Sequence, residues 1–287
     1  MATTAEFYVI GLLAILAIAV GSWVSGHLDR ARPYALAVCL IGSFGYAWIL
    51  SGRLGWFATL PAAAVVFWSN LVPILLSFTA GLAYRSQRLP SWRRPVTIGL
   101  FAMLALAFIV TPMLRATLTP LKLDSQSTWH EGVCLQSHPA SCGPAAAATL
   151  MQLHGIHSTE RALAKLCYTS QQGTEPLRLF SGLMAASRSK SVLPAVASPN
   201  PDRWAVQNQL PNIALVQFEA FQSERPNLSQ PIHRLLGPRG EGHAVVVLGR
   251  TDSGNWLIAD PAFGKTTWTS EQFRDRFTGD AIYLSRQ

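Results

Sequence analysis

The sequence predicts an all-α membrane domain of about four transmembrane helices, followed by a soluble α+β domain. Long apolar segments fill the first 115 residues. The remaining chain shows helical patterns first and strand patterns afterwards, the order typical of an α+β domain. Charge divides in the same way. Residues 1–122 carry nine Lys/Arg against two Asp/Glu, and residues 123–287 carry fourteen against thirteen, so +7 of the net charge of +8 belongs to the apolar part.

Four apolar segments are expected to form the membrane helices, because a crossing needs about 17–25 residues. They lie near residues 7–24, 34–50, 56–84 and 96–114. The third segment is long and contains Pro61, Asn70 and Pro73. We interpret it as one kinked or tilted helix, with a re-entrant segment or a double crossing as the alternative. The first segment follows no basic region, so we expect a retained helix and not a cleaved signal peptide.

Arginines between these segments predict the orientation, because positively charged loops stay in the cytoplasm. The connections between the first two and the last two segments are the basic ones, with Arg30, Arg32, Arg85, Arg88, Arg93 and Arg94. The second connection has only Arg53. We therefore expect a multi-pass protein of the bacterial cytoplasmic (inner) membrane, with its soluble domain on the extracytoplasmic side. The lipid bilayer is an expected partner, whereas basic residues that flank a membrane give little support to nucleic-acid binding.

A polar linker over residues 116–130 is expected to lead into one soluble domain, residues 131–287, which is long enough for its own core. Its expected helices run from Cys142 to about Leu153, Ser158 to Cys167, Pro176 to Ser187 and Ser270 to Arg276. Its expected strands run from Ile213 to Phe218, Ala244 to Leu248, Trp256 to Ala259 and Ala281 to Leu284.

Cys142 is the candidate nucleophile. It opens the run Cys-Gly-Pro-Ala-Ala-Ala-Ala, in which Pro144 suits a first helical turn. A helix start favours the reactive thiolate because its unpaired N–H groups and the positive end of its dipole lie beside the sulfur. Gln136 precedes the cysteine by six residues. Its side-chain amide and the Cys142 N–H are candidate donors to an oxyanion.

His243 and Asp260 are expected to meet across a β-hairpin. Two strand patterns flank the turn residues Asp252 to Asn255. Pairing the strands outward from this turn places His243 and Asp260 within about two positions of each other. A carboxylate at that distance can hold an imidazole in one tautomer. The sequence therefore predicts a His–Asp contact.

At these residues the sequence resembles the bacteriocin-processing cysteine peptidases, papain-like domains that cut exported peptides after a double-glycine leader. The likeness covers about Glu131 to Gln287. It includes Gln136, the Cys142 run, Thr169 to Gly173 with Leu177 and Leu179, His243 before a Val-rich strand, Asp260-Pro261-Ala262 with Gly264, and Phe273 ahead of Thr278-Gly279. The resemblance implies that Cys142 is the nucleophile, His243 the general base and acid, Asp260 its orienter and Gln136 the oxyanion donor. It implies no metal or organic cofactor.

The chain departs from that family pattern at four points. Ser141 stands where an acidic residue is usual, and Glu219 to Glu241 is longer than the usual link before the histidine. The membrane part precedes the peptidase, the reverse of the exporter-fused order. No ATPase is expected, because Gly264-Lys265-Thr266 looks like the end of a P-loop but Ala259 fills the first glycine position, and we interpret these residues as a turn.

The leading hypothesis is a membrane-anchored cysteine endopeptidase that cleaves exported peptides or proteins through a thioester. A papain-like module that binds or assembles peptides with little cleavage is an alternative, and a thioester acyl transferase is another. Expected partners are a peptide or protein substrate and a separate export or assembly machinery. Cys134 and Cys167 are candidates for a disulfide in an oxidising compartment. Cys134, His138 and Cys142 lack a fourth ligand for zinc.

Overall fold

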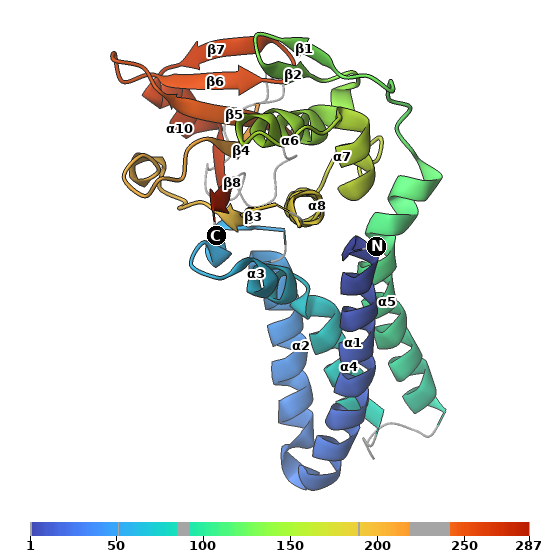
Figure 1. Cartoon of the computed structure of the whole chain (residues 1–287). Coiled ribbons are helices and arrows are strands. Elements are labelled where there is room, and N and C mark those ends of the chain that lie inside the picture. The colour runs from blue at the N-terminus through green and yellow to red at the C-terminus, as the bar shows by residue number, and fades with distance from the viewer. Residues whose placement is uncertain (1, 51, 85–91, 189, 219–241, 287) are drawn as a thin grey trace, which may run out of the picture.

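The structure is a computed structural model that describes residues 2–50, 52–84, 92–188, 190–218 and 242–286. A bundle of long helices stands below an α+β domain (Figure 1). Arg85, Arg88 and the long segment 219–241 lie outside the described residues.

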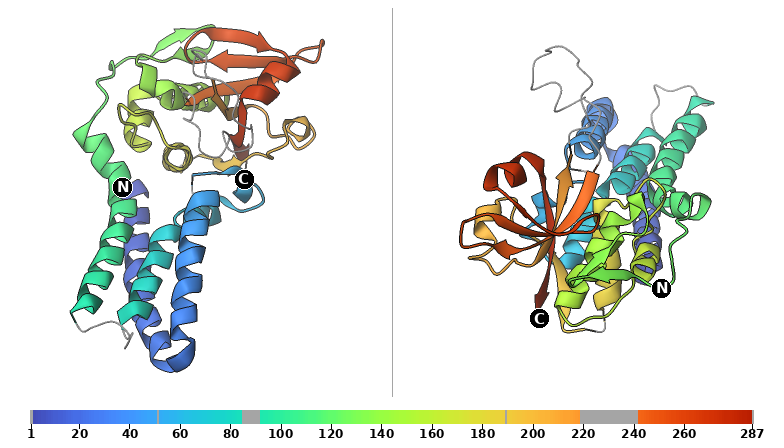
Figure 2. Two further views of the ribbon diagram at one scale, coloured as in Figure 1. Left: turned by 180° about the vertical axis from the view of Figure 1, so that it is seen from behind. Right: turned by 90° about the horizontal axis from the view of Figure 1, so that it is seen from above.

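The bundle contains four long helices that alternate in direction (Figures 1 and 2). They are α1 (Ala2–His27), α2 (Arg32–Ile49), α4 (Leu71–Tyr84) and α5 (Arg93–Leu118). Two spans, Tyr8–His27 and Arg93–Thr111, are long and apolar enough to cross a membrane, and a bent helix pair in the third apolar segment could form one more. Helix α2 does not meet this criterion. The number of about four crossings is therefore not confirmed, although the described helices follow the four predicted segments.

The third apolar segment is bent at Asn70. A short 3₁₀ turn, η2 (Gly55–Phe57), is followed by α3 (Ala62–Ser69), and α3 meets α4 at an angle of 46°. The Asn70 side chain donates to the Val66 carbonyl over 2.8 Å, and its Oδ1 accepts from Arg178 over 3.4 Å. These bonds satisfy the polar side chain at the bend, which lies within the segment that the sequence predicts to be kinked or tilted.

Helices α1 and α4 approach closely because small residues line their contact. Gly21 and Ser25 are four residues apart on α1, as are Ser77 and Gly81 on α4. A Cβ added at Gly21 would collide with the Phe78 carbonyl oxygen, and one at Gly81 would collide with the main chain of α1. The Ser25 hydroxyl donates to the Leu82 carbonyl over 2.9 Å. Small residues at such spacing are typical of helix pairs in membranes.

The soluble domain is built on a six-stranded antiparallel sheet in the order β3-β8-β4-β5-β6-β7. Its strands are β3 (Val192–Val196), β4 (Asn212–Gln217), β5 (Gly242–Arg250), β6 (Trp256–Asp260), β7 (Gly264–Trp268) and β8 (Phe277–Arg286). A separate hairpin joins β1 (Thr128–His130) and β2 (Val133–Leu135). The helices are α6 (Cys142–Leu153), α7 (Glu160–Leu166), α8 (Pro176–Ser187) and α10 (Ser270–Arg276), with short 3₁₀ turns η3 (Pro139–Ser141) and η4 (Pro201–Arg203).

Two hydrophobic clusters hold the domain together. One packs α6, α7 and α8 against the sheet, and the other gathers aromatic residues around Trp204 and Phe273. The first cluster also includes Leu54, Phe57 and Val65 from the η2–α3 region. The Gly55 N–H donates to the Asp280 carboxylate over 2.7 Å at the same junction. The apolar segment before Asn70 therefore packs against the soluble domain, whereas α4 packs against α1.

The observed elements confirm the four predicted helices of the soluble domain and correct other expectations. The prediction of a turn at Gly264-Lys265-Thr266 is wrong, because these residues begin β7. Strand β7 has only two buried residues, at its ends, so its pattern of hydrophobic residues is weak. Strand β3 was not predicted, and β8 is longer than expected. Cys134 and Cys167 are both buried free thiols, so the suggested disulfide is absent.

Replacing Gly81 by leucine is expected to destabilise the bundle by about 1–3 kcal/mol or more, because the added side chain would push α4 away from α1. Thermal denaturation of the detergent-solubilised protein measures the change. Gly99→Leu is the matched control, because a Cβ there meets no atom within 4 Å. Equal losses in the two variants would contradict the close packing of α1 and α4.

Candidate active site

Cys142 is the first residue of α6, as the sequence predicts. The preceding turn η3 is closed by a capping box, in which Ser141 Oγ accepts from the His138 N–H and donates to the His138 carbonyl. Ser141 is fully buried. The serine that replaces the usual acidic residue therefore fixes the turn that leads into the cysteine. Four buried alanines, residues 145–148, then let α6 pack closely on β5.

His243 and Asp260 form the contact predicted from the hairpin. Their strands pair antiparallel, with Val246 opposite Ala259 and a register shift nearer the turn. The His243 Nε2 and Asp260 Oδ1 atoms are 2.8 Å apart. Asp260 is 2% exposed, and its Oδ1 also accepts from the Ala262 N–H over 2.8 Å. The second bond fixes the carboxylate and thereby the orientation of the imidazole ring.

The Cys142 side chain lies close enough to His243 to affect the pKa of the imidazole. Since Nε2 faces Asp260, the other ring nitrogen is the one available to the sulfur. Burial of the ring lowers the His243 pKa, but the hydrogen bond to Asp260, the nearby Cys142 side chain and the negative charges of these groups outweigh burial and raise the pKa to about 9. The site therefore favours an imidazolium beside the sulfur, which is the partner that a thiolate needs.

Gln136 lies beside the end of the hairpin. It follows β2, and its backbone N–H donates to the Pro261 carbonyl over 2.8 Å. Its side-chain Oε1 is buried and accepts no hydrogen bond from the described residues. The structure thus brings Gln136 next to the Asp260 turn, while Cys142 and His243 meet through their side chains.

Glu160 is a buried acid that no sequence motif singles out. Only 2% of it is exposed, and its carboxylate accepts from both the N–H and the hydroxyl of Ser137, over 2.9 Å and 2.7 Å. Ser137 directly follows Gln136, so Glu160 ties the candidate oxyanion loop to α7. The signal that could have found it is an acid directly after the Thr159 helix cap, a position where an acid usually only complements the helix dipole.

Aromatic side chains form one wall around the histidine. The Phe218 ring lies 5.6 Å from the His243 ring, and the Arg276 guanidinium lies 5.1 Å from Phe218 and 4.6 Å from Trp268. Phe218 thus packs against the imidazole, and Arg276 in turn holds the Phe218 ring.

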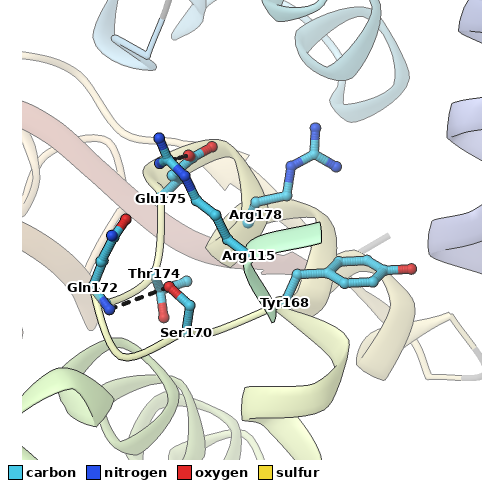
Figure 3. A pocket seen from close by; sticks show the side chains of 8 residues that line it. Arg115, Tyr168, Ser170, Gln172, Thr174, Glu175 and Arg178 are labelled. Atoms are coloured by element: carbon cyan, nitrogen blue, oxygen red, sulfur yellow. Dashed lines mark hydrogen bonds and ion pairs between the residues drawn. The ribbon is translucent and has the colours of Figure 1, made fainter. Parts of the chain in front are cut away.

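A small polar pocket of about 90 Å³ lies between the end of α5, the loop after α7 and the start of α8 (Figure 3). Arg115 and Glu175 form an ion pair of 3.4 Å at its edge. Thr174 lines this pocket and also packs against Gly143, where a Cβ would lie only 3.2 Å from the threonine side chain. Gly143 therefore allows this loop to approach the candidate nucleophile. Among the described residues, no group of three His, Cys, Asp or Glu is placed to hold a metal ion.

A helix that begins at a cysteine and packs on an antiparallel sheet bearing a His–Asp pair defines the papain-like α+β fold of a cysteine peptidase. The model of the Peptidase C39 family matches residues 130–287, more than half of the chain. The protein belongs to the Peptidase C39 family.

Two curated relatives are uncharacterised proteins. One, from Methanothermobacter thermautotrophicus, is 30% identical over 162 residues, which are 56% of this chain and 94% of the relative. The other, from Methanothermobacter marburgensis, is 30% identical over 158 residues, which are 55% of this chain and 90% of the relative.

Two similar solved structures are peptidase domains of transporters. The peptidase domain of Streptococcus ComA, a bi-functional ABC transporter, is 23% identical, with 55% of this chain and 100% of that domain covered and a TM-score of 0.41. A double glycine motif protease from an AMS/PCAT transporter, solved in complex with the leader peptide, is 18% identical, with coverages of 57% and 97% and a TM-score of 0.40.

The raised pKa of His243 predicts a pH dependence of stability. Because the folded-state pKa of about 9 exceeds the unfolded value of about 6.5, the contribution of His243 is complete below pH 6.5 and is lost as the pH rises through 9. We expect the difference in melting temperature between the wild type and His243→Gln to shrink between pH 6.5 and 9.5. Thermal melts of both proteins across this range measure it. A difference that stays constant or grows would contradict the raised pKa.

Proposed function

We propose that the protein is a membrane-anchored cysteine endopeptidase that cleaves exported peptides through a Cys142 thioester. The observation that carries the proposal is the chain of contacts from Asp260 through His243 to the first residue of α6. A buried carboxylate, an imidazole with a raised pKa and a cysteine at a helix start are the parts that activate a thiol for attack.

In the proposed reaction, the Cys142 thiolate attacks the carbonyl carbon of the scissile bond. The Cys142 N–H and the Gln136 side-chain amide stabilise the negative charge that develops on the carbonyl oxygen. His243 donates its proton to the leaving amine, and the thioester forms. Neutral His243 then removes a proton from water, which attacks the thioester and releases the acid product with the free thiol. Asp260 orients the imidazole in both steps.

The peptidase is proposed to face the extracytoplasmic side of the cytoplasmic membrane. Helices α2 and α5 begin at Arg32 and Arg93, at the end of the bundle far from the soluble domain (Figure 1). Positive charge at that end favours its retention in the cytoplasm. The soluble domain then contacts substrates after export, and the double-glycine preference that the family resemblance implies is part of the proposal.

Gln136→Ala is expected to lower peptide turnover by about 10²–10³, the usual effect of losing an oxyanion donor. The rate of Cys142 alkylation by iodoacetamide should change little, because the variant retains His243 and Asp260. Cleavage is measured by mass spectrometry on a peptide library with and without a double glycine. Gln171→Ala, at an exposed position, is the matched control, and Cys142→Ala is the inactive reference.

The products of the same assay distinguish the three candidate functions. A free carboxylic acid indicates hydrolysis, transfer of the acyl group to an added amine indicates a transferase, and bound but intact peptide indicates a binding module. Turnover by Cys142→Ala equal to that of the wild type would exclude the thioester route. A loss below about threefold in Gln136→Ala would remove the oxyanion role, given the usual size of that effect.

Cysteine accessibility in intact spheroplasts tests the orientation. In a Cys39→Ala, Cys142→Ala background, Ser253→Cys places a thiol on the exposed β5–β6 turn, and Ala31→Cys places one between α1 and α2. A membrane-impermeant maleimide is expected to label Ser253→Cys before lysis and Ala31→Cys only after lysis. The reverse order would place the peptidase in the cytoplasm. Cys134 and Cys167 are fully buried and should stay unlabelled in the folded protein.

A further inference from the structure

An apolar cavity of about 470 Å³ lies between the helical bundle and the soluble domain, away from the catalytic cysteine. Its walls come from α1, α3, α8 and β3, and its lining residues include Val9, Ile10, Val66, Phe67, Met184 and Leu193. Figure 1 shows α8 and β3 directly above the upper ends of these bundle helices. The volume falls within the range of about 300–1,000 Å³ that is usual for ligand pockets.

The position of the cavity indicates what can fill it. The candidate membrane span of α1 begins at Tyr8, so Val9 and Ile10 lie at the end of the span that faces the soluble domain. In the proposed membrane-anchored protein, the cavity opens at the level of the lipid headgroups. A cavity with apolar walls is a poor site for water. The abundant apolar groups next to that level are the acyl chains of phospholipids, which begin just beneath the headgroups.

The rim of the cavity carries positive charge. Arg188 follows the last residue of α8, lines the cavity and is exposed. No carboxylate pairs with it among the described residues, and exposed Lys190 lies two residues further along the chain. An apolar cavity with a cationic rim matches the two parts of an anionic phospholipid, since basic side chains at a membrane surface attract its phosphate.

We propose that this cavity binds an anionic phospholipid, with one acyl chain between α1, α3 and α8 and its phosphate at Arg188. The proposal rests on the proposed membrane anchoring of the protein. Bound lipid would occupy the junction of α3 with α8 and β3, where the bundle meets the soluble domain. It would therefore complete the apolar contact between the two parts without touching the active site.

The experiment uses the full-length protein in vesicles of phosphatidylcholine that contain one quarter phosphatidylglycerol. A phosphatidylglycerol with a photoactivatable diazirine in one acyl chain is the probe, and peptide mass spectrometry locates the cross-links. The exposed outer face of α5, with Met103 and Leu106, is the internal standard for ordinary contact with the bilayer. We expect cross-links at Met184 and Ala185 in addition to those on α5.

Two variants test the binding of the headgroup and of the acyl chain separately. Arg188→Gln is expected to lower cavity labelling by the phosphatidylglycerol probe at least about fivefold relative to the α5 standard, whereas Arg203→Gln, at an exposed arginine outside the cavity, leaves it unchanged. Ala63→Phe fills the cavity from an exposed position on α3 and should reduce labelling by every lipid probe. Ala185→Leu is a second filling variant on α8. Peptide cleavage should stay at the wild-type level in all four variants.

The outcomes distinguish this proposal from the one on which it rests. Labelling of α5 without labelling of the cavity would overturn the lipid site and leave membrane anchoring intact. Absence of both would overturn membrane anchoring and the lipid site together. A phosphatidylcholine probe could label the cavity as strongly as the phosphatidylglycerol probe, and Arg188→Gln could leave the labelling unchanged. These two results together would overturn the assignment of an anionic headgroup. Loss of peptide cleavage in Cys142→Ala remains a separate test of the catalytic proposal.

Discussion

The close packing of α6 on the sheet is the constraint on which the rest of the site depends. The four alanines at 145–148 are fully buried on all sides of α6, which contacts β5 as well as α7 and β2. Small side chains there let the helix lie near the strand, so the first residue of α6 reaches the first part of β5. Larger residues would hold the helix and its cysteine away from His243. The alanine run therefore determines the distance between the sulfur and the imidazole, besides favouring the helix.

The sequence predicted the parts of the site that depend on local chain geometry. A turn between two strands determines which residues meet across the hairpin, and this was enough to predict the contact between His243 and Asp260. A proline after a cysteine and a glycine was enough to predict the helix start at Cys142. Glu160 could not be selected in the same way, because its bonds to Ser137 join residues 23 positions apart. An acid at a helix start has the same local pattern whether it is buried or exposed.

In the fold, too, elements with a clear local pattern were predicted, and elements whose environment depends on distant residues were not. Strand β7 lies at the edge of the sheet and β3 at the other edge, and each has a partner on one side only. Polar residues are tolerated at such edges, so β7 lacks a clear hydrophobic pattern.

The third apolar segment shows a different limit of prediction from sequence. Its composition suggested a single crossing, but its first part is covered by the soluble domain, which presents an apolar surface of its own. A hydrophobic segment does not indicate whether lipid or protein will cover it.

The helical bundle and the soluble domain share a hydrophobic cluster and a hydrogen bond at their junction. Leu54, Phe57 and Val65 belong to the same hydrophobic cluster as α6, and the Gly55 N–H bonds the buried Asp280 of β8. Burial raises the Asp280 pKa, whereas the backbone N–H groups of Gly55 and Leu54 and the charge of Arg53 lower it and only partly offset burial. Among the described residues, its carboxylate is therefore held by backbone N–H groups of the segment that precedes α3. A soluble domain that shares its core and a buried acid with the bundle is expected to depend on that contact for stability. Such a domain is held in a defined orientation to the membrane helices, so the orientation of the bundle also determines the direction from which a substrate approaches Cys142.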